Sequence, residues 1–208
     1  MSNIINGFFP GMLLPNTVIA GCINVYENAW PNPDETIAAI ENECANPDSP
    51  AAWFRAETIG QGTFQTARTN LNMGITDLAL QQQNVLMQNV HNQFNMLLLA
   101  ATQSYVARYG IHDGLAHEPY NILKYSGGQE YKSHYDGGSA TGRCISALVY
   151  LNNNYEGGEL EFPNFGIKIK PEPGMLLLFP SNFAYSHVAH PVSDGTKYAL
   201  VTWIRDTV

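Results

Sequence analysis

The sequence predicts a mainly β fold with supporting helices, an α+β arrangement in which N-terminal helices pack on a jelly-roll, cupin-like core. From Glu118 onward, short alternating or β-branched runs are separated by clusters of Gly, Pro and Asn, which is typical of antiparallel sheet structure. Two helical patterns precede this block. The length of 208 residues and the apolar content of 45% suit one globular domain with a sizeable core.

Two helices are predicted in the N-terminal half. The first begins near Asp34 and ends before Pro47, and its apolar residues recur at helical spacing. The second covers residues 77–109, with Gly110 in the place of a C-terminal cap. We expect both helices to brace the sheet structure.

About eight strands are predicted in the C-terminal half, and so many in one continuous block favour a jelly roll or a related closed sandwich. They cover residues 120–125, 130–134, 145–151, 160–162, 166–169, 175–179, 186–190 and 197–204. The segment 59–75 is rich in Gly, Thr, Asn and Gln, and we expect a long connection that acts as a binding loop or lid.

Charge and cysteine content narrow the function classes. A net charge of −8 argues against a surface that follows nucleic-acid phosphates. Cys22, Cys44 and Cys144 are an odd and widely spaced set, which fits neither a disulfide framework nor a zinc knuckle and favours a reducing compartment. Since the N-terminus lacks a signal-peptide pattern and no stretch resembles a membrane span, we expect a soluble, cytoplasmic protein without nucleic-acid or membrane partners.

A pattern of metal-binding residues gives the strongest chemical signal. Residues two apart in a strand face the same side, so His134 and Asp136 would project together while Tyr135 points away. His187 would join them from a distant strand, and His190 would face the opposite side of a regular strand. Two imidazoles and one carboxylate form the facial triad that holds non-haem Fe(II) and leaves coordination positions open.

Lys197 suggests what else binds near the metal. A cation downstream of His187 could pair with the far carboxylate of a 2-oxo dicarboxylic acid, so the pattern points to an oxygenase. A His beside an Asp can also be an ordinary hydrogen-bonded pair. His91, His112 and His117 are interpreted as structural or surface residues.

Several motifs in the C-terminal half occur in an order typical of one enzyme family. They are YSGGQEYKSHYD at 125–136, RCISALVYLN at 143–152, GGELEFP at 157–163, PGMLLLF at 173–179, and HxxxPVxxGxK at 187–197 followed by Trp203. The stretch from Glu118 to Arg205 thereby resembles the 2-oxoglutarate- and Fe(II)-dependent oxygenases of the prolyl 4-hydroxylase type. The resemblance implies a double-stranded β-helix, which agrees with the jelly roll predicted from the strands.

The resemblance also implies roles for individual residues, with none catalytic beyond the metal centre. It implies iron ligands at His134, Asp136 and His187; cosubstrate contacts from Lys197, Tyr125 and Tyr150, with Lys197 on the C5 carboxylate of 2-oxoglutarate; and a peptide-side lining of Tyr131, Arg143 and Trp203. The two cosubstrate tyrosines could instead be aromatic packing, Trp203 a core residue and Arg143 a member of a surface ion pair.

The function implied is that of a dioxygenase that uses Fe(II), 2-oxoglutarate and O₂ to hydroxylate a prolyl residue in a peptide or protein, releasing succinate and CO₂. Ascorbate is a further candidate cofactor, and the oligomeric state stays open. In one domain over residues 1–208, residues 1–117 would supply helical support and a substrate-side loop, and residues 118–208 the catalytic core.

Two alternatives remain at this point. The same chemistry could act on another residue type or a small molecule, because Leu160 stands where many prolyl 4-hydroxylases have Thr, and His190 where animal members often have Cys. Arg68-Thr69-Asn70 resembles a substrate-side Arg-Thr-Ser segment of the family but does not decide the substrate. The other alternative is a jelly-roll binding module without catalysis, since fold alone does not fix function.

Overall fold

Two antiparallel sheets form the core of the computed structural model, which describes residues 16–56, 67–111, 114–138 and 141–207. The larger sheet has the order β1 (Asn16–Ile19), β2 (Ile23–Tyr26), β12 (Leu176–Pro180), β8 (Arg143–Tyr150), β14 (Val192–Asp206), β6 (Asn121–Ser126), β4 (Leu71–Gly74) and β3 (Phe54–Arg55). β5 (Leu115–His117) and β9 (Tyr155–Gly157) also pair with β14. The smaller sheet has the order β11 (Ile167–Ile169), β10 (Leu160–Phe162), β13 (His187–Ala189) and β7 (Tyr131–His134).

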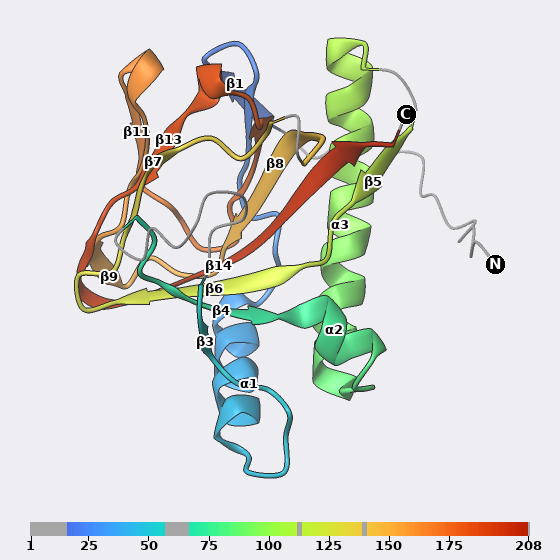
Figure 1. The fold of residues 1–208 in the computed structure, drawn as a ribbon, viewed down its shortest axis with the longest axis vertical. Helices are drawn as coiled ribbons and strands as arrows, with labels where there is room; N and C mark the ends of the chain where they lie inside the picture. The colour runs from blue at the N-terminus through green and yellow to red at the C-terminus, as the bar shows by residue number, and fades with distance from the viewer. Residues whose placement is uncertain (1–15, 57–66, 112–113, 139–140, 208) are drawn as a thin grey trace.

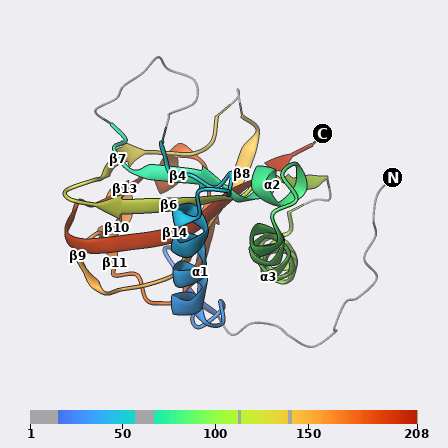
Figure 2. The same cartoon turned by 90° about the horizontal axis from the view of Figure 1, so that it is seen from below.

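Three helices lie on one side of the larger sheet, away from the smaller sheet (Figures 1 and 2). They are α1 (Pro33–Ala45), α2 (Ile75–Leu80) and α3 (Val85–Tyr109). Short 3₁₀ turns occur at Pro163–Phe165 and Phe183–Tyr185. The mainly β jelly roll with supporting helices, predicted from the sequence, is thus confirmed.

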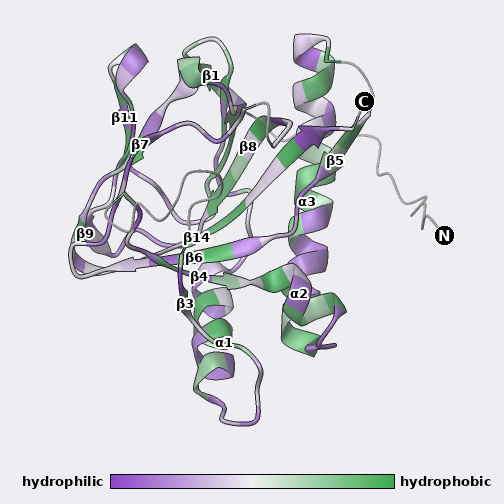
Figure 3. Cartoon of the chain, viewed as in Figure 1, coloured by the Kyte–Doolittle hydropathy of each residue, from purple (hydrophilic) through white to green (hydrophobic). Residues whose placement is uncertain are grey.

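The long helix α3 packs through one face only. Phe94, Leu98, Ala101 and Tyr105, all at most 2% exposed, belong to the apolar cluster between the helices and the larger sheet. Apolar and polar residues alternate along α3 in Figure 3, as expected for a helix that covers a sheet. Gly110 ends the helix in the left-handed conformation, with φ of 64°, as the sequence predicted.

The predicted helix over 77–109 is two helices. Asn84 caps α3, because its side chain accepts a hydrogen bond from the backbone N–H of Met87 at 3.0 Å. The turn before this cap separates α2, which ends at Leu80, from α3, which begins at Val85. The apolar residues over 77–109 keep helical spacing throughout, but the cap at Asn84 starts a new helix within this stretch.

The N-terminal half supplies strands as well as helices. β2 inserts between β1 and β12, and both its apolar Ile23 and its polar Asn24 are fully buried. The predicted connection 59–75 contains β4, which pairs with β6. Residues 59–66 of the predicted lid, which include Gly60 and Gly62, lie outside the described residues.

Strand alternation sets the two faces of the larger sheet. On β14, Tyr198, Leu200 and Ile204 pack toward the helices, whereas a second row faces the smaller sheet. That second row consists of Lys197, Ala199, Val201 and Trp203. The central strand of the fold therefore presents one cation and one indole in the same inward-facing row.

Within the described part of the chain, no helix combines the length and the apolar character needed to cross a membrane.

Candidate metal centre

Three side chains with metal-binding donor atoms meet between the two sheets. His134 ends β7 and His187 begins β13, and the two residues are direct partners in the register of these strands. Asp136 lies close to both rings: its Oδ1 is 3.6 Å from Nε2 of His134, and its Oδ2 is 3.6 Å from Nε2 of His187. Their donor atoms all lie within 4.8 Å of one another, and this is the one cluster of three or more His, Cys, Asp or Glu suited to a metal in the described residues.

Both imidazoles are held with Nε2 free to coordinate. The Nδ1 atom of His134 is 2.7 Å from the carbonyl oxygen of Lys132, and Nδ1 of His187 is 3.1 Å from the carbonyl oxygen of Tyr185. A carbonyl only accepts hydrogen bonds, so each Nδ1 carries the proton. The neutral form of each ring therefore carries its lone pair on Nε2, the atom that faces Asp136.

The protonation states of Asp136 and His187 also suit metal binding. Burial lowers the pKa of His187 to about 4, so the ring is neutral at neutral pH. Burial by itself would raise the pKa of Asp136, but His187, His134 and the hydrogen bond from Ser146 together hold it well below its usual range. An ionised carboxylate and a neutral imidazole are the forms that coordinate a divalent metal.

Asp136 reaches the cluster by a route that strand alternation alone does not explain. β7 ends at His134, so Asp136 lies in the loop beyond the strand. The backbone N–H of Gly137 donates to the carbonyl of Ser181 at 2.7 Å, and a Cβ at position 137 would lie 2.8 and 2.9 Å from two backbone oxygens. Tyr135 is 52% exposed and points away from the cluster. Close backbone docking therefore places the carboxylate, and it requires glycine at 137.

The three donors line one pocket together with Lys197. The space not filled by protein atoms amounts to about 480 Å³, with the open mouth included. Much of the wall is apolar and is formed by Leu123, Leu148, Leu160, Ala199 and Val201. A largely apolar pocket with a few convergent polar groups is the usual form of a small-molecule site.

Lys197 is an almost completely buried cation, only 2% exposed. Its Nζ donates to the carbonyl of Gly158 at 2.5 Å and lies 5.5 and 5.0 Å from the ring centres of Tyr125 and Tyr150. No carboxylate among the described residues forms a salt bridge with it, and burial lowers its pKa to about 7, although Glu159 acts in the opposite direction. An ammonium in this situation has donors to spare for an anionic ligand.

The two predicted cosubstrate tyrosines both line the pocket. Burial raises the pKa of Tyr125 to about 12, and burial likewise raises the pKa of Tyr150 well above its usual value. The hydroxyl of Tyr150 is buried and has no hydrogen-bond partner among the described residues. A buried hydroxyl without a partner is costly, so this group favours a polar ligand in the pocket.

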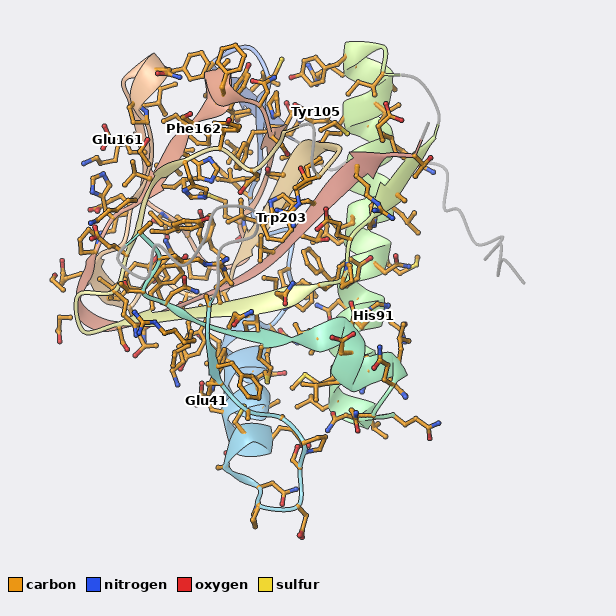
Figure 4. The ribbon with its side chains drawn as sticks, viewed as in Figure 1. Glu41, His91, Tyr105, Glu161, Phe162 and Trp203 are labelled. Carbon is orange, nitrogen blue, oxygen red and sulfur yellow. The ribbon has the colours of Figure 1, made fainter. Side chains whose placement is uncertain are left out.

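The predicted peptide-side residues occupy two different positions. Tyr131 and Trp203 line the pocket, and Trp203 lies near the middle of the molecule (Figure 4). Arg143 does not line it; its guanidinium stacks on Trp203, 3.6 Å from the ring centre, and binds both carboxylate oxygens of Glu118, at 2.7 and 2.5 Å. The charge of Arg143 is thus neutralised within the protein, and its flat face supports the indole.

The remaining histidines lie away from the cluster. His190 pairs with Glu161 at 2.5 Å, and Glu161 lies on the outer face of the smaller sheet while its neighbour Phe162 points inward (Figure 4). His91 and His117 line a second pocket on the helix side of the fold. His112 falls outside the described residues.

Sequence reasoning missed four residues that support this site. Ser146 and Ser181 form a hydrogen-bonded pair next to Asp136, Glu118 holds Arg143, and the carbonyl of Gly158 holds Lys197. One of them left a signal: Ser146 is a small polar residue in the middle of the otherwise apolar β8. The others act through contacts that join segments far apart in sequence.

Known proteins resemble the part of the chain that forms this site. The model of the 2OG-Fe(II) oxygenase superfamily, where 2OG is 2-oxoglutarate, matches residues 120–205. Probable prolyl 4-hydroxylase 9 of Arabidopsis thaliana is 38% identical over an alignment of 118 residues, and the match covers 43% of this chain and 41% of that protein. Prolyl hydroxylase EGLN3 of Mus musculus is 36% identical over an alignment of 87 residues, and the match covers 38% of this chain and 36% of that protein.

A solved structure extends the likeness in fold to most of the described chain. A prolyl hydroxylase from Trichoplax adhaerens, in complex with a hypoxia inducible factor oxygen degradation domain peptide fragment, superposes with a TM-score of 0.71. The superposition covers 90% of this chain and 84% of that chain at 21% sequence identity.

The chain spans less than half the length of the curated relatives it matches. The family match nevertheless contains all three metal-ligand candidates and Lys197. Residues 120–205 therefore match the 2OG-Fe(II) oxygenase superfamily, and the relatives that they resemble are prolyl hydroxylases.

Proposed function

We propose that this chain is an Fe(II)- and 2-oxoglutarate-dependent dioxygenase, acting as a single domain, that hydroxylates a prolyl residue in a peptide or protein. The observation that carries the proposal is the meeting of His134, Asp136 and His187 in the same buried pocket as the unpaired ammonium of Lys197. In this proposal the three donors hold the iron, and Lys197 binds the C5 carboxylate of 2-oxoglutarate.

The pocket suits both groups chemically. Two imidazoles and an ionised carboxylate match the ligand set of non-haem Fe(II) sites. A dicarboxylic 2-oxo acid would supply the anionic partner that Lys197 lacks and a partner for the buried hydroxyl of Tyr150. Both of these polar groups would thus be better paired in the proposed complex.

Bound Fe(II), 2-oxoglutarate and O₂ would supply the oxidising chemistry, with CO₂ and succinate as the coproducts. The contribution of the protein is to bind, to orient and to exclude water. The aliphatic side chains of Leu148, Leu160 and Val201 keep the pocket dry, which strengthens the pairing of Lys197 with a carboxylate. The backbone carbonyls on the two Nδ1 atoms keep both imidazoles in the orientation that coordination needs.

A peptide is the proposed substrate. The relatives named above are prolyl hydroxylases, and one solved structure of such a protein holds a peptide fragment. Trp203 presents a buried Nε1–H without a partner among the described residues, a donor suited to a peptide carbonyl. Because Glu118 neutralises Arg143, that guanidinium is not available to bind the carboxylate of a free amino acid.

A peptide screen tests this proposal. The protein, supplied with Fe(II) and 2-oxoglutarate in air, is expected to add one oxygen atom to a proline-containing peptide, as read by mass spectrometry, and to release succinate in equal amount. Matched peptides with alanine in place of proline should gain no oxygen. Free proline and other amino acids form a third arm, and oxygen gain only in that arm would reject the peptide substrate. Repeating each arm with and without ascorbate tests our further proposal that ascorbate supports turnover.

The affinity for 2-oxoglutarate is expected to depend on pH through Lys197. Its pKa of about 7 means that the ammonium is present below pH 7 and is lost above it in the ligand-free protein. Binding that requires the ammonium should therefore weaken by about tenfold per pH unit above 7, until the raised pKa of the complex is reached. The ratio of dissociation constants for 2-oxopentanoate and 2-oxoglutarate isolates this effect, because 2-oxopentanoate lacks the C5 carboxylate but shares the metal-binding end.

Calorimetry at pH 6.5, 7.5 and 8.5 on protein saturated with Mn(II) measures this ratio without turnover. We expect the preference for 2-oxoglutarate to be largest at the lowest pH. A ratio that does not change with pH would show that Lys197 is not the group that recognises the second carboxylate.

A further inference from the structure

Two buried serines connect the carboxylate of Asp136 to the larger sheet. Ser146, on β8 at the centre of that sheet (Figure 1), has its Oγ 2.6 Å from Oδ2 of Asp136. The Oγ of Ser181, just after β12, is 2.8 Å from the Oγ of Ser146. The exposed fractions of Ser146 and Ser181 are 0% and 1%. The contact therefore lies within the protein and does not depend on solvent.

The direction of these hydrogen bonds follows from their chemistry. An ionised carboxylate only accepts, so Ser146 donates its single hydroxyl proton to Asp136. Ser146 then has no proton left for its other neighbour, and Ser181 must be the donor between the two hydroxyls. The result is a one-way chain from Ser181 through Ser146 to Asp136.

The same region also fixes the backbone next to Asp136. The carbonyl of Ser181 accepts from the N–H of Gly137 at 2.7 Å, and the N–H of Ser181 donates to the carbonyl of Cys144 at 3.0 Å. Asp136 is thus held at two points, through its carboxylate and through the residue that follows it. Since it lies outside any strand, these contacts replace the support that sheet pairing gives to His134 and His187.

We infer that Ser146 and Ser181 are positioning residues that fix the rotation of the Asp136 carboxylate, so that this residue gives the metal one oxygen instead of two. The inference rests on the proposed function, because it assigns Asp136 to a metal. A metal with three protein donors keeps three of six positions open, enough for a bidentate 2-oxo acid and O₂. A carboxylate free to rotate and bind through both oxygens would occupy one of those positions.

The size of the expected effect follows from other metal sites. Loss of a hydrogen-bond partner to a metal ligand commonly lowers metal affinity by about 10- to 100-fold. We expect a weakening in that range for Ser146→Ala. A smaller weakening is expected for Ser181→Ala, because Ser181 reaches the carboxylate only through Ser146. The metal affinity of the double variant should equal that of Ser146→Ala, because Ser181 contacts Asp136 only through the hydroxyl of Ser146.

Titration with Co(II), followed by visible absorption, reads both affinity and coordination. Ser146→Ala is expected to raise the dissociation constant for Co(II) and to change the ligand-field bands. Ser146→Thr keeps the hydroxyl, so its dissociation constant and its bands should lie closer to the wild-type values. Ser193→Ala is a matched control, because Ser193 is exposed and donates only to the carbonyl of Glu156. Thermal unfolding of the metal-free proteins is measured in parallel, and Ser181→Ala carries the test if Ser146→Ala does not fold.

Two outcomes would overturn the inference. In one, Ser146→Ala lowers the unfolding temperature but binds Co(II) with wild-type affinity and an unchanged spectrum, as a purely structural pair would. In the other, the effects of Ser146→Ala and Ser181→Ala simply add. Failure of the proposed function looks different, because wild-type protein would then bind Co(II) no better than His187→Ala.

Discussion

Replacing His187 with alanine is expected to abolish 2-oxoglutarate turnover and to weaken Fe(II) binding by more than about 100-fold. Loss of a group that merely orients a ligand already costs about 10- to 100-fold in metal affinity, so loss of the ligand itself should cost more. His187 is 5% exposed and packs among Phe162, Phe179 and His134, and the two phenylalanine rings offer no replacement donor. Anaerobic calorimetry with Fe(II) and a succinate-release assay measure the two effects.

His190 provides a matched control on the same segment of chain. It lies three positions beyond His187, but its Nε2 is bound to Glu161 at 2.5 Å on the outer side of the smaller sheet. His190→Ala is expected to leave Fe(II) affinity and turnover within about twofold of wild type, as for most surface substitutions. The pair of variants therefore separates the loss of one particular ligand from the loss of any imidazole in this region.

If His187→Ala turned over at the wild-type rate, the proposed metal centre would be wrong, whatever the result for His190→Ala.

His187→Ala also removes a buried imidazole and leaves a cavity, which could destabilise the fold. His187→Gln keeps much of the side-chain volume and is expected to lose turnover as well. Thermal unfolding of both metal-free variants shows whether the fold persists.

The inward-facing rows of the larger sheet were predictable from the sequence, because strand alternation is a local property. The odd-numbered residues 197–203 of β14 face the pocket, as period-two spacing requires, and the site residues at both ends of this row were found. The kind of metal could also be predicted from the sequence, since the donor atoms of His134, Asp136 and His187 suit only some metals. Pattern and ligand chemistry thus led to the same pocket.

Features that depend on contacts between distant segments were not predictable. Alternation placed Asp136 on the strand with His134, whereas β7 ends first and the docking of Gly137 on Ser181 supplies the geometry. β2 was missed because its four residues are too short a run to give a distinct strand pattern. The partner of Arg143 was also unknown, and Glu118 makes Arg143 a member of an ion pair that supports Trp203, which was the alternative to a peptide-side lining residue.

Lys197→Met should have the second large effect, on cosubstrate recognition. Removing one partner of a buried, hydrogen-bonded charge pair costs about 2–5 kcal/mol, so the dissociation constant for 2-oxoglutarate is expected to rise by about 30- to 5,000-fold. Lys168→Met is the control, since Lys168 is 51% exposed and pairs only with Glu161 at 3.5 Å. Calorimetry on Mn(II)-saturated protein measures both variants, and the metal affinity itself should not change.

The same substitution is expected to stabilise the metal-free protein, which shows that lost binding does not come from unfolding. Lys197 has a pKa of about 7 in the fold, against about 10.4 in the unfolded chain. Below pH 7 both states are protonated and the fold carries the full cost of the buried charge, about 5 kcal/mol. From pH 7 to about 10.4 the unfolded state binds more protons, so this cost falls as pH rises. Lys197→Met should therefore unfold at a higher temperature than wild type at pH 6, with a smaller difference at pH 9.5.

Cosubstrate selectivity is the sharpest test of this role for Lys197. Wild-type protein should prefer 2-oxoglutarate over 2-oxopentanoate, because the C5 carboxylate pairs with the buried ammonium, whereas the methyl group of the analogue leaves that ammonium with the carbonyl of Gly158 and no anionic partner. In Lys197→Met the preference should reverse, since a carboxylate would then be buried against a thioether without a donor, whereas the methyl group fits an apolar wall. If the substitution instead weakened the binding of both acids equally, Lys197 would support the pocket without recognising the second carboxylate. Because the metal-binding ends of the two acids are identical, only the residue facing the C5 position can reverse their order.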